Sequence, residues 1–193
     1  MIDTTAINRE RSLFQDRESV WLFGYGSLIF KVDFPFRERR PASIQGWARR
    51  FWQGSHDHRG TPENPGRVVT LIEAPGVRCA GMAYRVSPAV FGQLDVREKN
   101  GYLRFSTPMT FEDGGQEDGL VYIATADNAA FLGPAPVADV AAHIHRSHGP
   151  SGANRDYLLN LAEALRELGE QDEHIFEIEH HLNLLAREQA VRG

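Results

Sequence analysis

The sequence contains only one cysteine, Cys79, among its 193 residues. A single cysteine excludes an internal disulfide framework and suits a reducing compartment, so the expected location is the cytoplasm. Apolar runs are short: none approaches the ~20 residues that span a bilayer, and residues 1–20 lack the apolar stretch of a secretory signal. Repeats and low-complexity tracts are absent too. With 41% hydrophobic and 24% charged residues, the chain is expected to fold as one globular domain.

Charge is unevenly distributed along the chain. Residues 37–67 contain seven arginines and three acidic residues, whereas residues 151–193 contain nine acidic residues and four arginines. The basic segment can attract a small anion, but it lacks the broad basic face that a nucleic-acid duplex requires. Alternatively, these arginines solvate strand edges or pair with the acidic C-terminal helices. We therefore expect a small-molecule partner, and neither a nucleic acid nor a membrane.

Strand patterns fill the first two-thirds of the sequence, and helix patterns fill the last third. Apolar or alternating runs predict strands at residues 20–24, 43–53, 67–73, 78–86, 103–111 and 119–125, with the third and fourth forming one hairpin and the last two another. Caps and apolar stripes predict helices at residues 88–94, from residue 136, from a Ser151 cap to Gly169, and around residues 175–185. Residues 1–19 resemble a frayed, flexible leader before a domain at 20–190. This order favours an α+β fold whose antiparallel or mixed sheet can curl into a barrel.

A glycine-rich turn follows the first predicted strand. It consists of Gly24, Tyr25, Gly26, Ser27 and Leu28. Two glycines let the backbone adopt positive φ and let a ligand approach peptide N–H groups, so the turn can bind a carboxylate or a phosphate. It matches neither the dinucleotide fingerprint, nor the phosphate loop, nor the hydrolase nucleophile elbow. A tight turn that simply needs glycine explains the same residues.

Two charged segments offer further candidate chemistry. In residues 95–102, Glu98 stands between two cations near the end of a short helix and could act as a positioned acid or base. In residues 49–60, aromatic and cationic residues crowd before a loop and could recognise carboxylates or stacked bases. Plainer interpretations are a solvated charge run for the first segment and a strand with core aromatics for the second.

Metal and thiol chemistry are only weakly indicated. The eight histidines include a group at residues 143–148 and an adjacent pair at 180–181, and neither has a recognised ligand spacing. Cys79 lies in a predicted strand without an obvious histidine partner. We expect neither a metal site nor a thiol nucleophile.

Taken together, these motifs resemble one known family. The matching segments are FGYGSLI at 23–29, KVDFP at 31–35, RRFWQGS at 49–55, DHRG at 57–60, PGRVVTL at 65–71, REK at 97–99, GY at 101–102, LGPAP at 132–136 and GPSG at 149–152. They are similar to the ChaC family of glutathione-specific γ-glutamylcyclotransferases. The resemblance extends from Val20 to the last helix.

The resemblance implies an enzyme that cleaves glutathione to 5-oxoproline and cysteinylglycine without a cofactor. It implies a small mixed β-barrel flanked by helices. By the same match, the turn from Gly24 to Leu28 holds the γ-glutamyl group, and Glu98 is the catalytic acid/base. Phe30, Val96 and Asn100 depart from the tryptophan, aromatic and glycine usual in the family, which concerns the fit of the substrate more than the chemistry.

The implied reaction is an intramolecular aminolysis, in which the α-amine of the glutamyl group attacks its own γ-carbonyl and a dipeptide amine leaves. The α-carboxylate must be held, the ammonium must lose a proton and the leaving nitrogen must gain one. One carboxylate can perform both proton transfers if burial raises its pKa. Glu98 is therefore expected to be partly buried, with Arg97 and Lys99 pointing away.

The remaining candidate residues follow from charge and position. Tyr102 could orient the glutamyl amine or the scissile carbonyl, and Arg50, Arg59 or Arg67 could pair with the glycine carboxylate of glutathione. Two alternatives stay open: a cyclotransferase for other γ-glutamyl amines, and a non-catalytic regulator of cation transport. Formation of 5-oxoproline from glutathione distinguishes these possibilities.

Overall fold

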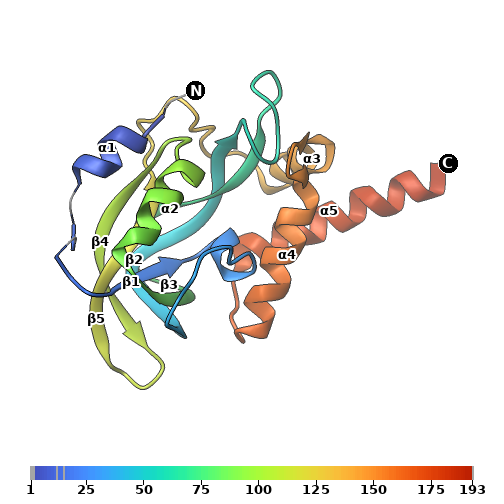
Figure 1. Ribbon diagram of the computed structural model, residues 1–193. Helices are drawn as coiled ribbons and strands as arrows, with labels where there is room; N and C mark the ends of the chain where they lie inside the picture. Colours follow the sequence, from blue (N-terminus) through green and yellow to red (C-terminus); the bar gives the residue numbers. More distant parts are fainter. Residues whose placement is uncertain (1–2, 12, 15, 193) are drawn as a thin grey trace. The chain divides into compact units, whose positions relative to one another are not determined.

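The computed structural model describes residues 3–11, 13–14 and 16–192, which form two compact units (Figure 1). The barrel unit comprises residues 3–49 and 71–129, and the helical unit comprises residues 50–70 and 130–192. The chain therefore leaves the barrel unit once and returns to it before the helical unit is complete. Each unit is built from segments that are far apart in the sequence.

Five strands form a closed barrel in the order β1-β3-β2-β4-β5. They are β1 (Val20–Gly24), β2 (Glu38–Ser55), β3 (Gly66–Val86), β4 (Tyr102–Phe111) and β5 (Gln116–Ala124). Strand β1 runs antiparallel to β3 and parallel to β5, and β4 runs antiparallel to both β2 and β5. The pairing of β2 with β4, at Ala42 and Ser43, closes the sheet into a barrel. The α+β fold with a mixed barrel expected from the sequence is confirmed.

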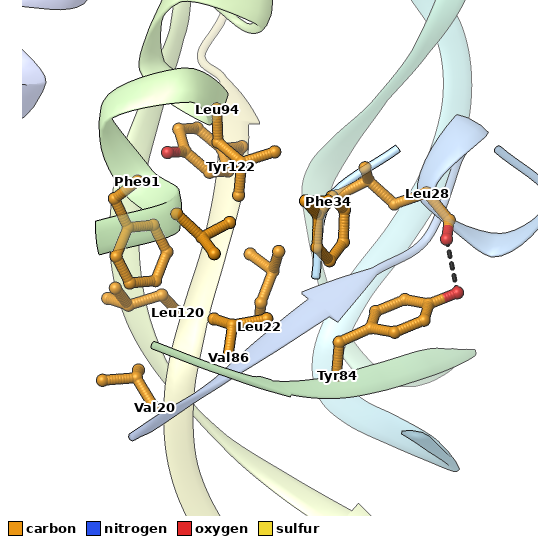
Figure 2. Packing of buried hydrophobic residues seen from close by; sticks show 11 residues of the cluster. Val20, Leu22, Leu28, Phe34, Tyr84, Val86, Phe91, Leu94, Leu120 and Tyr122 are labelled. Atoms are coloured by element: carbon orange, nitrogen blue, oxygen red, sulfur yellow. Dashed lines mark hydrogen bonds between the residues drawn. The ribbon is translucent and has the colours of Figure 1, made fainter. Parts of the chain in front are cut away.

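The core of the barrel unit lies between β1, β3, β5 and the helix α2 (Phe91–Arg97), as Figure 2 shows. Leu22, Leu94 and Leu120 are completely buried there. Tyr84 brings a polar atom into this core, and its hydroxyl donates a hydrogen bond to the backbone oxygen of Leu28 at 2.6 Å. Burial raises the pKa of Tyr84 to about 12, so it stays a neutral donor.

The hairpin predicted from residues 67–73 and 78–86 is wrong, because both segments belong to the single strand β3. The turn-forming residues between them lie within the continuous strand and do not reverse the chain. Gly76 has a φ of +81°, a conformation that favours glycine. The predicted pairing of the last two strands is confirmed, with Tyr102 opposite Ala124 in β4 and β5.

Two short helices belong to the barrel unit. Ser87 is the N-cap of the short 3₁₀-helix η2 (Pro88–Val90), which leads directly into α2. Its hydroxyl accepts a hydrogen bond from the Ala89 backbone N–H, as the capping sequence predicts. The other helix, α1 (Thr5–Glu10), lies in the segment expected to be a frayed leader. It packs against α2 and β4. Residues 1–2, 12 and 15 of that segment lie outside the described residues.

The helical unit contains α3 (Val137–Arg146), α4 (Asn154–Glu167) and α5 (Glu173–Arg192), and the short pair β6 (His148–Gly149) and β7 (Gly152–Ala153). The apolar stripes predicted for these helices are buried, as at Leu161 and Ile178. Ser151 does not cap α4 as predicted, because the β6–β7 turn takes it up and the helix begins at Asn154. Among the described residues, no helix has the length and apolar character needed to cross a membrane.

Candidate active site

The glycine-rich turn follows β1 and leads into η1 (Ser27–Ile29). The expected positive φ is wrong for both of its glycines, and Gly26 has a φ of −127°. The glycines serve close approach instead. A Cβ on Gly24 would lie 2.7 Å from the Leu28 Cβ, and a Cβ on Gly81 of β3 would lie 2.1 Å from the Gly24 backbone oxygen. The turn therefore folds back on itself and lies directly against β3.

Buried side chains fix this turn from the inside. Tyr25 is buried, and its hydroxyl donates to the backbone oxygen of Tyr122 at 2.7 Å. The guanidinium of Arg49 donates to the backbone oxygens of Tyr25, at 2.5 Å, and of Ala80. Leu28 belongs to the core. Tyr25 and Leu28 thus anchor the turn, and Ser27 is the residue of the turn whose side chain meets the charged groups described below.

Glu98 follows the last residue of α2, and its backbone N–H donates to the Leu94 backbone oxygen at 2.8 Å. Its side chain is only 17% exposed, which agrees with the partial burial expected from the sequence. The expectation that Arg97 points away is wrong, since the Arg97 Nε lies 3.4 Å from the Glu98 Oε1. A guanidinium at this distance stabilises the ionised carboxylate.

Arg97 takes this orientation because its other two guanidinium nitrogens bind residues that precede β2 in the chain. One donates to the Ser27 hydroxyl oxygen at 3.0 Å, and the other contacts the Asp33 carboxylate and the Lys31 backbone oxygen. A single guanidinium therefore contacts both Ser27 of the turn and the Glu98 carboxylate. The arrangement places a hydroxyl, a cation and a carboxylate together, which are the groups needed to hold an anionic amino acid and to move a proton.

A buried polar cluster lies behind Glu98. Asp95 is 1% exposed, accepts a hydrogen bond from the Tyr122 hydroxyl at 2.7 Å and lies 3.3 Å from the Arg104 Nε. Burial raises the pKa of Tyr122, and its hydrogen bond to Asp95 adds to the effect. These three residues match no motif in the sequence. One signal for Asp95 is its position four residues after Phe91, on the buried face of the same helix.

Tyr102 is partly buried and packs against the barrel core. The three candidate arginines, Arg50, Arg59 and Arg67, all belong to the helical unit. Arg59 donates to the Ala153 backbone oxygen at 3.1 Å and lies over the Tyr157 ring.

Arg67 has mainly structural partners. It is 7% exposed and donates to the backbone oxygens of Phe51, at 2.9 Å, and Gly133, at 3.1 Å. Burial lowers the pKa of its guanidinium, and the charge of Arg146 lowers it further.

The histidines show no shared ligand geometry. His143 donates to the Pro65 backbone oxygen at 2.7 Å, and His58 contacts the Ser151 hydroxyl. In the part of the chain that the structure describes, no three histidine, cysteine or acidic side chains are grouped so that they could hold a metal ion.

Comparison with known proteins gives a consistent set of matches. The sequence model described as "ChaC-like protein" matches residues 20–185. "Gamma-glutamylcyclotransferase 2-3" of Arabidopsis thaliana is 46% identical over 172 residues, covering 83% of this chain and 86% of its own length. "Glutathione-specific gamma-glutamylcyclotransferase 1" of Danio rerio is 41% identical over 182 residues, covering 89% of this chain and 92% of its own length.

A solved structure extends the match to three dimensions. The crystal structure of a γ-glutamyl cyclotransferase specific to glutathione, from yeast, superposes with a TM-score of 0.80 at 32% identity. The superposition covers 86% of this chain and 96% of the yeast chain. The likeness therefore includes nearly all of the yeast enzyme.

Proposed function

This chain belongs to the family of ChaC-like proteins, and on that premise we propose that it is an enzyme that degrades glutathione to 5-oxoproline and cysteinylglycine. Relatives named glutathione-specific γ-glutamylcyclotransferase are 35–41% identical to it over most of the chain. The family match and the full-length relatives support the reaction. The geometry of the turn and of Glu98 supports the roles proposed for individual residues.

Glu98 acts as the base and then as the acid. Its carboxylate accepts a proton from the α-ammonium of the glutamyl group, and the freed amine attacks the γ-carbonyl carbon. A carbon–nitrogen bond forms in the five-membered ring, the bond to the cysteine nitrogen breaks, and the proton returns from Glu98 to that nitrogen. The ring nitrogen then gives its second proton to the ionised Glu98 carboxylate, which passes it to the released amine, so that 5-oxoproline leaves neutral at nitrogen and the dipeptide leaves as an ammonium. Because nucleophile and electrophile belong to one molecule, binding in a bent conformation can lower the barrier by up to ~7–11 kcal/mol.

The turn from Gly24 to Leu28 holds the glutamyl group next to this carboxylate. The Ser27 hydroxyl and the Arg97 guanidinium supply a donor and a positive charge for the α-carboxylate. The Arg97 Nε lies 3.4 Å from the Glu98 Oε1, so the proposed base has a cationic neighbour. Tyr102 is proposed to orient the substrate. The raised pKa expected for Glu98 stays a prediction.

The single observation that carries the assignment of Glu98 is that one guanidinium contacts both Glu98 and Ser27. The test is Glu98→Gln, with Glu117→Gln on an exposed part of β5 as the matched control. We expect Glu98→Gln to bind glutathione by calorimetry but to form 5-oxoproline about 100-fold more slowly or worse, because a neutral amide cannot carry the proton. Wild-type turnover in Glu98→Gln would refute the role of Glu98.

A second candidate substrate class comes from the Arabidopsis relative, whose name does not restrict it to glutathione. A panel of γ-glutamyl amines and amino acids tests this, with kcat/KM compared for each compound. A value for glutathione well above the others supports glutathione specificity. If no compound yields 5-oxoproline, the enzymatic proposal fails and a non-catalytic role in cation transport gains support.

We also propose that the protein acts in the cytoplasm, where the thiol of a single cysteine such as Cys79 stays reduced. Fractionation of cells that carry a tagged chain tests the location.

A further inference from the structure

The N-terminal segment Asp3–Arg11 lies outside the residues that match the family, which begin at residue 20. It nevertheless contributes buried polar side chains to the barrel unit: Thr4 is 3% exposed and Asn8 is fully buried. Polar side chains are rarely buried without hydrogen-bond partners, so the partners of these two residues show what the segment holds.

Thr4 forms hydrogen bonds to the turn that follows Glu98. Its backbone N–H donates to the Lys99 backbone oxygen at 3.0 Å. Its hydroxyl lies 3.0 Å from that same oxygen and 2.8 Å from the Tyr102 backbone oxygen. Asp3 adds a β-bridge to Asn100. The turn thus has its carbonyl groups fixed on both sides of Gly101, whose φ of +91° makes a tight bend.

Asn8 holds the start of β4. Its side-chain amide donates to the Tyr102 backbone oxygen at 2.9 Å, and its side-chain oxygen accepts from the Arg104 backbone N–H at 2.9 Å. The backbone oxygen of Asn8 accepts from the Arg104 guanidinium, which also faces Asp95 on α2. Asn8 is therefore connected to β4 directly and to α2 through one buried cation.

These contacts hold the chain on both sides of Glu98. Asp95 precedes Glu98 in the chain and the Lys99–Tyr102 turn follows it, and both are connected to the N-terminal segment. Thr4 and Asn8 therefore act on Glu98 through its neighbours in the chain. A catalytic group must be held within about 0.5 Å of its productive position, and a displacement of ~1 Å can lower a rate about 100-fold.

We infer that Thr4 and Asn8 are positioning residues, which orient the Glu98 carboxylate through the turn after it and through Asp95. The inference rests on the proposed role of Glu98. It makes an N-terminal segment outside the family match part of the machinery for turnover, with no part in binding glutathione.

The test uses the full chain and three single substitutions. Thr4→Val removes the hydroxyl and keeps the shape, Thr4→Ser keeps the hydroxyl, and Asn8→Ala removes the side-chain amide. We expect Thr4→Val and Asn8→Ala to lower kcat about 10-fold or more while KM for glutathione stays within about twofold, and Thr4→Ser to retain turnover. Glu10→Gln, an exposed change on the same helix, is the control and should match the wild type.

A second comparison separates positioning from general stability. Adding Thr4→Val to Glu98→Gln should leave the residual turnover unchanged, because the carboxylate on which Thr4 acts is already gone. All assays are run where circular dichroism shows each variant folded, and if Asn8→Ala unfolds, the Thr4→Val and Thr4→Ser pair decides. A further fall in the double variant overturns the inference.

The outcomes also distinguish the inference from the proposed function. A wild-type protein that forms no 5-oxoproline overturns both. A fully active Glu98→Gln overturns the role of Glu98 and the inference that rests on it, while the proposed activity stands. If the wild type is active and Glu98→Gln is not, wild-type kcat in Thr4→Val and Asn8→Ala overturns the positioning role alone.

Discussion

At the residue scale, the centre of the candidate site is an ion pair between chain neighbours. Arg97 and Glu98 are adjacent in sequence, and their charged groups are 3.4 Å apart in space. Both side chains are largely buried, so solvent screens this pair less than it screens an exposed one. The same guanidinium donates to Ser27, so the position of the base and that of the turn depend on one side chain.

This dependence gives a prediction for Arg97. Arg97→Gln removes the positive charge and the fork that contacts Ser27, Asp33 and Glu98 together, so kcat/KM for glutathione should fall about 10- to 100-fold. Arg97→Lys should recover little, because an ammonium cannot reach all three partners at once. Steady-state release of 5-oxoproline measures the effect.

Arg85→Gln is the matched control for this prediction, since Arg85 forms exposed pairs elsewhere on the barrel unit. Equal losses in the Arg85 and Arg97 variants would show that net charge matters and that the contacts of Arg97 do not.

At the element scale, the candidate site depends on close packing between the turn and the strands around it. Gly24 and Gly81 let the turn and β3 approach to distances that a Cβ on either residue would prevent. Arg49 then joins the Tyr25 and Ala80 backbone oxygens across that contact. The turn is thus fixed to its neighbours before any substrate arrives, which limits the entropy lost on binding.

In the helical unit, the three candidate arginines are expected to differ. Arg67→Met leaves the backbone oxygens of Phe51 and Gly133 without their buried donor, so we expect the free energy of unfolding to fall by about 2–4 kcal/mol in urea titrations. Arg50→Met and Arg59→Met should lower the free energy of unfolding less than Arg67→Met does. If one of them binds the glycine carboxylate, its KM for glutathione rises more than its kcat falls.

An unchanged KM in both the Arg50 and Arg59 variants would show that the charge of the substrate is met elsewhere. A fully stable Arg67→Met would contradict the structural role of Arg67.

At the scale of the whole molecule, each unit is assembled from distant segments, so its stability depends on groups that the sequence keeps apart. His143 of α3 donates to Pro65, 78 positions away. Burial lowers the pKa of His143, because the protonated ring is costly there. The unfolded chain therefore binds this proton more readily, and stability is complete above the unfolded value of ~6.5 and is lost as pH falls below it.

We accordingly expect the Tm of the wild type to fall between about pH 7.5 and about pH 5.5, and His143→Gln to show a smaller fall. The side-chain amide of the introduced glutamine can donate the hydrogen bond to the Pro65 backbone oxygen, and it does not take up a proton in this pH range. His180→Gln, at an exposed position on α5, should behave as the wild type does. Identical pH dependence in the His143 variant and the wild type would contradict the assignment.

The same division between local and distant information explains which features of the molecule could be predicted. The strand at residues 20–24, the Ser87 cap and the buried stripe of α4 depend on residues close in sequence, and each is confirmed. The hairpin at residues 67–86 is wrong because β3 runs continuously from Gly66 to Val86, and its end pairs with β1, which is far away along the chain. The orientation predicted for the Arg97 side chain is wrong because its guanidinium contacts Ser27 and Asp33, which are far away along the chain.

The sequence by itself determined the family, the placement of most strands before the long C-terminal helices, and the presence of one carboxylate among cations after a short helix, because these properties depend on local patterns and motifs. Only the tertiary structure decided that Arg97 joins Ser27 to Glu98, that Asp95 is buried with Arg104 and Tyr122, and that Asn8 reaches β4. The physical reason is that folding of the barrel unit brings together groups up to 98 positions apart, and pairing between such groups leaves no periodic trace in the chain.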